Sequence, residues 1–228
     1  MSEHNTGQTV VNFLTQTRTG KELDELGARA VSAIGQRITT FLEKRIERRR
    51  QNVEACLDSA GEKLVQRGGA TNKPSGAEVE DLLLAASEAD QEEIREMFSN
   101  LLAAKMDARV AGVAHPSFAK VLAQMGPLDA RVLQVLYKSI LVNPPSKRHL
   151  ASASFENVAR GLSVSIEAVT ISCENLIRLG VLNRGGGLGA LNTANQVGFE
   201  PYGWILVSVC TGAVSVEQYH YLGQSDSS

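Results

Sequence analysis

Residues 155–199 carry the pattern that most restricts how this chain can fold. Two short helices with apolar periodicity are predicted there, FENVARGL and IEAVTISCENLIRLG, separated by the tight turn SVS. A strand (VLNR), a glycine-rich stretch (GGGLGALNTAN) and a second strand (QVGF) follow. Together with a preceding helix over residues 129–140, this is the order of elements in a winged helix-turn-helix. An ordinary helical hairpin followed by a β-hairpin stays open as the alternative.

The rest of the chain is dominated by helix patterns. From Lys21 to Arg67, apolar residues recur at steps of three, four and seven, which predicts one long amphipathic helix. Further helices are predicted over residues 77–90, 91–109, 115–126, 127–141 and 201–214, with a linker over residues 142–154. The sequence therefore predicts a mainly α fold with a flexible N-terminus (1–20), a helical region (21–126), a winged-helix-like region with a small β-hairpin (127–216) and a flexible tail (217–228).

Local signals place the ends of several of these helices. Ser165 is a predicted N-cap for the second helix of the helix-turn-helix, and Gly180 is its predicted end. Gly126 is predicted to end the helix that starts near Pro116. Within the helix pair, the apolar side chains of one helix are expected to face those of the other, namely Val158, Ala159 and Leu162 against Val169, Cys173, Leu176 and Ile177.

The chemistry of this segment does not favour DNA reading. A recognition helix presents Arg, Lys, Asn or Gln to base edges and has basic residues around it for phosphates. The charged residues between 164 and 180 are Glu167, Glu174 and Arg178, a net charge of −1, and Asn175 is the only amide there. The predicted wing adds one basic residue, Arg184. We therefore expect the shape of a winged helix without most of its DNA chemistry, and nucleic-acid binding is disfavoured.

One concentrated basic run, EKRIERRR, lies in the long first helix. Arginine clusters bind phosphate, but mixed charge at this spacing is also typical of a solvated helix face. Both readings stay open. The candidate interaction surface consists of the arginines of this run and the charged residues of the second helix of the helix-turn-helix: Arg45, Arg48, Arg49, Arg50, Glu167, Glu174 and Arg178.

The sequence contains no pattern for catalysis, for a metal site or for a cofactor. The four histidines, His4, His115, His149 and His220, have no HxxxH or HExxH spacing. No phosphate-binding GxxxxGK[ST] motif is present. His115, next to Pro116, is expected to cap a helix or to bond the backbone. The sequence predicts a protein that is not an enzyme.

The cysteines and the N-terminus favour a cytoplasmic protein. Cys56, Cys173 and Cys210 are far apart and odd in number, which is typical of reduced thiols, and Cys173 lies on an apolar helix face. The N-terminus has no signal-peptide pattern, and no apolar run is long enough to span a bilayer.

Two central stretches, EEIREMFSNLLAAKMD (92–107) and HPSFAKVLAQMGPLDARVL (115–133), resemble the signature of the bacterial abortive-infection protein alpha family. The family has no established biochemical function. RLGVL and FEPYGWILVSVC are also similar to family motifs, although Gly126 and Glu200 stand where the family usually has Ser and Thr. The resemblance covers about residues 40–215. Its matching positions are His115, Pro116, Ser117, Phe118 and Asp129, for which we expect roles in helix initiation or packing.

The resemblance implies an association with phage resistance but supplies no catalytic residues. The preferred hypothesis is a defence protein that acts through contacts with a protein partner of host or phage. The alternative is a winged-helix DNA-binding transcriptional regulator. The long first helix has more apolar surface than it can cover alone, so it packs either on residues 78–110 or on a second copy in a homodimer.

Overall fold

The computed structural model describes residues 20–68, 71–142, 152–185 and 196–212, and for residues 20–38 it describes the backbone alone. The chain divides into two compact units, Met1–Arg49 and Arg50–Ser228. Helix α2, Gly20–Arg67, runs across the boundary and agrees with the long helix predicted from the sequence. The predicted flexible ends lie outside the described residues, except that Gly20 already belongs to α2.

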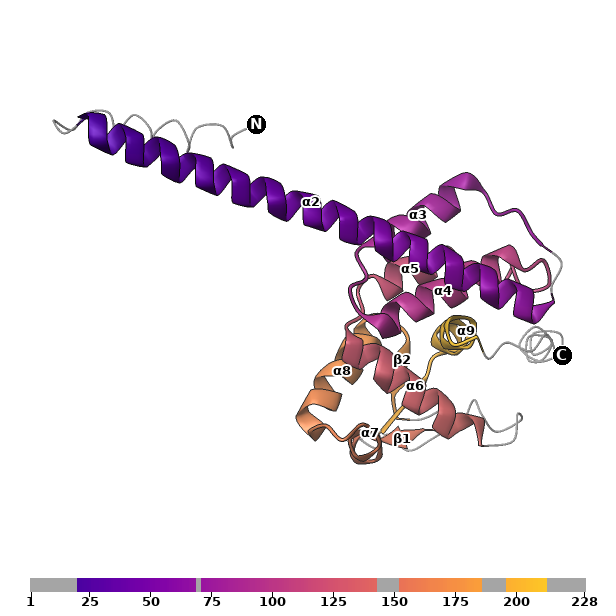
Figure 1. Cartoon of the computed structure of the whole chain (residues 1–228). Coiled ribbons are helices and arrows are strands. Elements are labelled where there is room, and N and C mark those ends of the chain that lie inside the picture. The colour runs from indigo at the N-terminus through magenta and orange to yellow at the C-terminus, as the bar shows by residue number, and fades with distance from the viewer. Residues whose placement is uncertain (1–19, 69–70, 143–151, 186–195, 213–228) are drawn as a thin grey trace. The chain divides into compact units, whose positions relative to one another are not determined.

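The second unit is built around the buried helix α4, Glu92–Met106 (Figure 1). Ile94, Met97, Phe98, Leu101 and Leu102 are all buried in one continuous hydrophobic core. Four other helices pack against α4: α3 (Gly76–Ser87), α5 (Ser117–Leu122), α6 (Pro127–Leu141) and α9 (Pro201–Cys210). The winged-helix-like part therefore shares its core with the helical region, and the predicted boundary at residue 126 stays a prediction.

The winged-helix-like part follows α6. Its elements are β1 (Ala153–Ser154), α7 (Phe155–Leu162), α8 (Ile166–Arg178), β2 (Leu182–Arg184) and β3 (Gln196–Phe199). Helices α6, α7 and α8 pack against one another in pairs. The three strands form an antiparallel sheet in the order β1-β3-β2. This arrangement confirms the mainly α fold with a small antiparallel sheet that the sequence predicts, and the winged-helix assignment stays a prediction.

The sheet corrects one part of that prediction. Residues 142–154 were expected to be a linker and the sheet a hairpin, but Ala153 pairs with Val197 and Ser154 with Gln196, which adds a third strand. A strand of two residues has no periodicity of its own and forms because β3 offers a free edge. The predicted glycine-rich wing lies mostly outside the described residues, which resume at Gln196.

Local capping explains where these helices begin and end. Ser154 Oγ accepts a hydrogen bond from the Asn157 amide at 3.3 Å, and Ser165 Oγ accepts one from the Ala168 amide at 3.2 Å. Helix α8 ends before Gly180, whose φ of +70° suits glycine. The prediction for Gly126 was wrong: α5 ends at Leu122, and Gly126 is instead the residue before the first turn of α6.

A buried carboxylate closes the end of α4. Asp107 accepts hydrogen bonds from the backbone amide, Nε and Nη2 of Arg109, at 3.1, 3.0 and 2.8 Å. These bonds hold the pKa of Asp107 below its ordinary value. Arg109 Nη2 also donates a hydrogen bond to the Arg67 carbonyl at 3.0 Å. The Arg109 side chain therefore links the last residue of α2 to the end of α4.

Helix α9 packs closely on strand β3 and on the helices α4 and α6. Tyr137 and Phe199 contact Trp204 with ring centroids 5.0 and 5.7 Å apart. A methyl group on Gly203 would lie 1.9 Å from the carbonyl oxygen of Val181, so only glycine allows this approach. No described helix is apolar over a stretch long enough to cross a membrane.

The close approach at Gly203 gives a testable prediction. Gly203→Ala forces α9 away from the Val181 backbone, and we expect the free energy of unfolding to fall by about 3 kcal/mol or more. The control is Gly61→Ala in α2, where a methyl group meets nothing within 4 Å and should raise stability by up to about 1 kcal/mol. Urea unfolding measures both. Equal effects of the two substitutions would contradict the packing described for α9.

Candidate functional site

The outward side of α8 is where a helix-turn-helix protein would meet its ligand. Steps of four, three and four residues place Glu167, Ile171, Glu174 and Arg178 in one row, which we call the outer stripe. Ile171 is 72% exposed in the middle of this row, and Ile166, in the first turn, is 36% exposed. An apolar side chain between two carboxylates offers no donor to base edges and no positive charge to phosphate.

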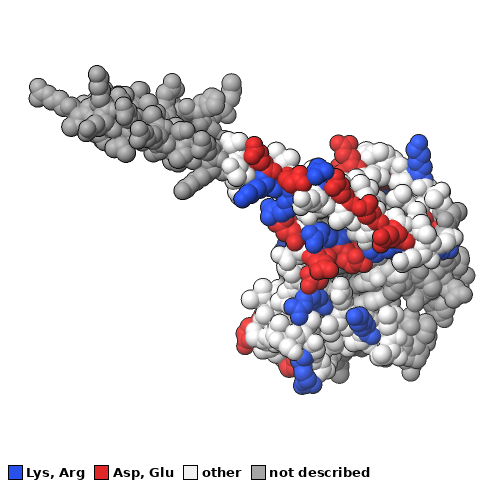
Figure 2. Space-filling view, in the orientation of Figure 1, with Lys and Arg blue, Asp and Glu red and all other residues white. Residues whose placement is uncertain are grey.

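The basic residues near the outer stripe are engaged in local contacts. Arg184 of β2 forms an ion pair with Glu174. Arg178 Nη2 donates to Asn175 Oδ1 at 2.8 Å. On the face shown in Figure 2, acidic and basic side chains are interspersed and form no broad basic patch. The outer stripe has two carboxylates, Glu167 and Glu174, and one guanidinium, Arg178. Its net charge is therefore −1, as the sequence predicts.

The inner side of α8 is anchored by the buried carboxylate of Asp129. Ser172 Oγ donates to Asp129 Oδ1 at 2.5 Å, and Asn175 Nδ2 donates to Asp129 Oδ2 at 2.7 Å. The amide of Gly126 donates to the same Oδ2 at 2.8 Å, which caps the first turn of α6. We call these four residues the Asp129 clamp.

The remaining family-signature positions fasten α5 to α9. His115 Nδ1 accepts a hydrogen bond from the Ser117 amide at 3.2 Å and lies 2.7 Å from Ser117 Oγ. Ser117 Oγ in turn lies 2.7 Å from the hydroxyl of Tyr202 in α9, and the Phe118 and Tyr202 rings meet edge to face. Pro116 is the residue before the first turn of α5. These contacts join α5 to α9, and the roles in helix initiation and packing that the sequence predicts for these positions stay predictions.

A contact between serine and histidine is only part of a catalytic site. Nucleophilic catalysis also needs a group that orients the base and donors for the developing oxyanion. Among the described contacts, His115 Nδ1 bonds only Ser117, and the ring packs against Phe118. No group of three or more His, Cys, Asp or Glu side chains within the described residues is placed to hold a metal ion.

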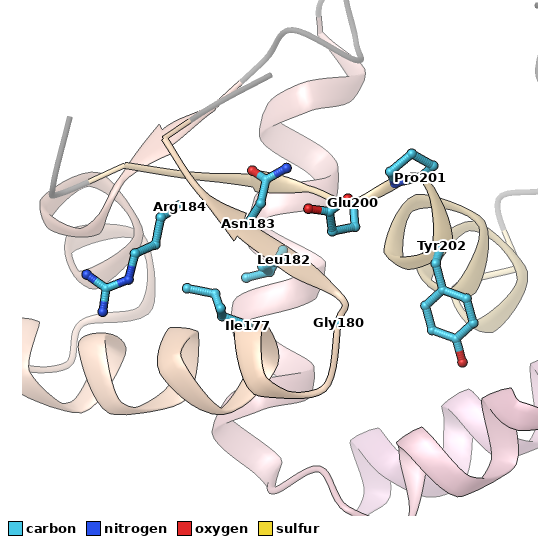
Figure 3. Close-up of a pocket in the computed structure, with 8 residues that line it drawn as sticks. All are labelled: Ile177, Gly180, Leu182, Asn183, Arg184, Glu200, Pro201 and Tyr202. Carbon is cyan, nitrogen blue, oxygen red and sulfur yellow. The ribbon is translucent and has the colours of Figure 1, made fainter. Parts of the chain in front are cut away.

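A groove of about 740 Å³ opens between the end of α8, β2 and the start of α9 (Figure 3). Ile177 and Leu182 give it an apolar side, and Arg184 and Glu200 place one cation and one anion on its wall. Its lining has no histidine, cysteine or serine to serve as a nucleophile or base.

The three cysteines are free thiols buried in the core. Burial raises the pKa of all three, that of Cys173 to about 12, with the nearby Glu174 and Asp129 as further causes at Cys173. Thiols in this state are poor nucleophiles. The predicted core role of Cys173 is confirmed.

The residues of the candidate interaction surface lie in two separate parts of the sequence and are divided between the two compact units. Arg45, Arg48 and Arg49 belong to the unit Met1–Arg49, whereas α8 belongs to Arg50–Ser228. Arg50 bonds Glu54 one helix turn away at 2.9 Å. That pair matches the reading of the basic run as a helix face with charges paired at a spacing of four residues.

Sequence reasoning missed the polar side of the site. It did not connect Ser172 or Asn175 with Asp129, because these residues lie more than forty positions apart and no local spacing joins them. Tyr202 was missed for the same reason. Ile171 could have been found, since an apolar residue four positions after Glu167 and three before Glu174 falls on the outward side of the helix.

The Asp129 clamp yields a direct stability test. Asp129→Asn keeps the shape but replaces one acceptor oxygen with an NH₂ group, which leaves buried donors without a partner. We expect a loss of about 1–3 kcal/mol in the free energy of unfolding. The control is Asp58→Asn on the exposed side of α2, which should change it by no more than about 0.5 kcal/mol. Similar values for the two variants, measured by urea unfolding, would refute the clamp.

Comparison with known proteins finds a matching family. The sequence model of one family, described as abortive infection alpha, matches residues 42–199. No curated protein and no solved structure matches the chain. The matched range begins in α2 and ends with β3, so it includes the buried helix α4, the residues around Ser117 and the Asp129 clamp. Because this match covers more than half of the sequence, the chain belongs to the abortive infection alpha family.

Proposed function

We propose that this chain contributes to abortive infection through protein contacts and catalyses no reaction, with the outer stripe of α8 as its docking surface. The observation that carries the proposal is Ile171, 72% exposed between Glu167 and Glu174. Membership of the family supports the defence role. The partner is a protein of the host or the phage.

Energetic considerations support a docking role for this face. An exposed isoleucine gains about 1.5–3 kcal/mol when it is fully buried, so covering Ile171 would stabilise a complex. The flanking carboxylates make the surface negatively charged. This charge favours a partner that has basic groups around an apolar pocket. Such a surface would be repelled by the phosphates of DNA.

The alternative is a winged-helix DNA-binding regulator. The order of helices and strands in this chain suits that role, but the readout of bases requires hydrogen-bond donors on the outer stripe. There the stripe has two carboxylates, and its arginine bonds Asn175. The nearest other guanidinium, Arg184, is paired with Glu174. These contacts favour the protein-docking proposal over the regulator.

A cytoplasmic location in a bacterium is part of the proposal. The free thiols of Cys56, Cys173 and Cys210 support it, because reduced cysteines are typical of that compartment.

The proposal predicts that Ile171→Asp abolishes phage protection while the fold remains intact. A charge on the docking surface weakens binding, whereas a substitution at an exposed position should change stability by no more than about 0.5 kcal/mol. The matched control is Leu84→Asp, on a residue 64% exposed in α3, which should leave protection unchanged. Plaque counts and survival of cells that express each variant, across several phages, provide the measurement.

Three outcomes would overturn the proposal. Absence of protection by the unaltered protein against every phage tested would remove the defence role. Full protection by Ile171→Asp would remove the outer stripe as the docking surface. Sequence-specific DNA binding at moderate salt, seen as an electrophoretic shift with a steep salt dependence, would establish the regulator instead.

A further inference from the structure

Strand β2 forms one edge of the small sheet. In the order β1-β3-β2, the described strands leave one side of β2 without a neighbour. The amide of Gly185 donates a hydrogen bond to the Gln196 carbonyl of β3 at 2.9 Å. Because backbone groups alternate in direction along an antiparallel strand, the amide and carbonyl of Arg184 point away from β3. An open strand edge of this kind is a template on which an extended chain adds a further strand.

The groove of about 740 Å³ at the end of α8, which we call the β2 groove, runs along this strand (Figure 3). Leu182, Asn183 and Arg184 all contribute to its lining. Successive side chains of a strand point to opposite faces of the sheet, so Leu182 and Arg184 lie on one face and Asn183 on the other. Ile177, at the end of α8, adds to the apolar surface of the Leu182 face. The β2 groove therefore combines side chains from both faces of the sheet edge.

The Asn183 face of the β2 groove has two hydrogen-bond acceptors. Asn183 is paired with Gly198 of β3, and Glu200 comes two residues after Gly198, so the two side chains are diagonal neighbours on one face. The Asn183 Oδ1 atom is buried, and no described group donates a hydrogen bond to it. The Glu200 carboxylate makes no cap hydrogen bond to α9, and the ion pairs among the described residues do not include it. An acceptor without a donor is unfavourable when it is buried, so this face favours a ligand that brings donors.

The charges in the lining favour a cation as that donor. Arg184 is the one basic residue of the lining, and its guanidinium is paired with Glu174. Glu200 is therefore the charge in the groove that has no counterion in the described part of the chain. Lysine and arginine combine a cationic head with an aliphatic stem, which suits a groove that has both a carboxylate and apolar walls.

From these features we propose that the β2 groove binds an extended segment of another protein, with a lysine or arginine at its centre. The segment adds a strand beside β2 and bonds the backbone of Arg184. Its basic side chain faces Glu200 and the amide of Asn183, which turns about its Cβ–Cγ bond to accept a hydrogen bond. The residues before and after it point to the opposite face, where Ile177 and Leu182 receive apolar side chains. This site does not depend on the docking role proposed for the outer stripe.

An NMR titration of the isotope-labelled full-length protein with the blocked tripeptide acetyl-Val-Lys-Val-methylamide tests the site. We expect saturable shifts of the amides in β2 and in the first turn of α9, with a dissociation constant of about 1 mM or lower. The same peptide with norleucine in place of lysine keeps the aliphatic stem without the charge, and it should bind at least about tenfold more weakly. Methylation of both valine nitrogens removes the donors of the added strand and should also weaken binding.

Variants of the protein then assign the contacts. Glu200→Gln removes the carboxylate charge and should weaken binding of the lysine peptide by at least about tenfold. Glu156→Gln, the same change on an exposed carboxylate of α7, is the matched control and should leave binding unchanged. Asn183→Ala removes the second acceptor and should weaken binding by at least about threefold. Ile171→Asp should not affect the peptide, so a failure of this proposal and a failure of the outer stripe are distinguishable.

Each result either supports the proposal or overturns it. Binding that requires the lysine charge, the valine amides and Glu200 supports it. Absence of saturable shifts in β2 at up to about 10 mM peptide overturns it. Equal binding of the lysine and norleucine peptides, or equal effects of Glu200→Gln and Glu156→Gln, also overturns it. Shifts of the same amides with spermidine, together with undiminished binding of the N-methylated peptide, would make the groove a site for free amines in place of a protein segment.

Discussion

The hydrogen bonds to the Asp129 carboxylate determine the orientation of the helix on which the functional argument depends. Two of its donors, Ser172 and Asn175, lie on α8, and the third is the backbone of Gly126 at the start of α6. A buried carboxylate is stable only when its oxygens are bonded, so the two helices cannot slide or rotate independently. The rest of the winged-helix-like part builds on this pair, since α7 packs against both and β2 follows α8 directly.

Because the Asp129 clamp fixes the rotation of α8, the two sides of this helix have different roles. The inner side is committed to packing, with Val169, Cys173 and Leu176 fully buried beside the polar clamp. The outer stripe is consequently held toward solvent in one orientation, as recognition helices are. What differs is its chemistry, in which Glu167 and Ile171 occupy places that a DNA reader would give to donors. The same scaffold thus presents a surface suited to protein rather than to bases.

Much of the fold followed from local signals in the sequence. The ranges predicted for α6, α7 and β3 agree with the structure, because a proline begins α6, the tight turn SVS follows α7 and β3 has an isolated strand pattern. Strand β1 could not be predicted, because two residues become a strand only through pairing with Val197 and Gln196 far along the chain. Long-range pairing has no signature in a single sequence.

The candidate site was predictable to the same extent. The outward positions of Glu167, Glu174 and Arg178 follow from helix periodicity alone. The Asp129 clamp did not, because a carboxylate at the start of one helix and an amide on another reveal their contact only in three dimensions. Asp129 was identified as a family-signature position with a role in helix initiation, which is half of what the structure assigns to it.

A double-mutant cycle between Asp129→Ala and Ser172→Ala tests the central claim most directly, because it isolates the coupling between α6 and α8 from the separate effects of each substitution. The claim predicts that the two losses in unfolding free energy are not additive and that the coupling is at least about 1 kcal/mol, since removing either partner already breaks their shared hydrogen bond. Losses that add to within about 0.3 kcal/mol would contradict it, and would mean that the hydrogen bond between Ser172 and Asp129 does not couple α8 to α6.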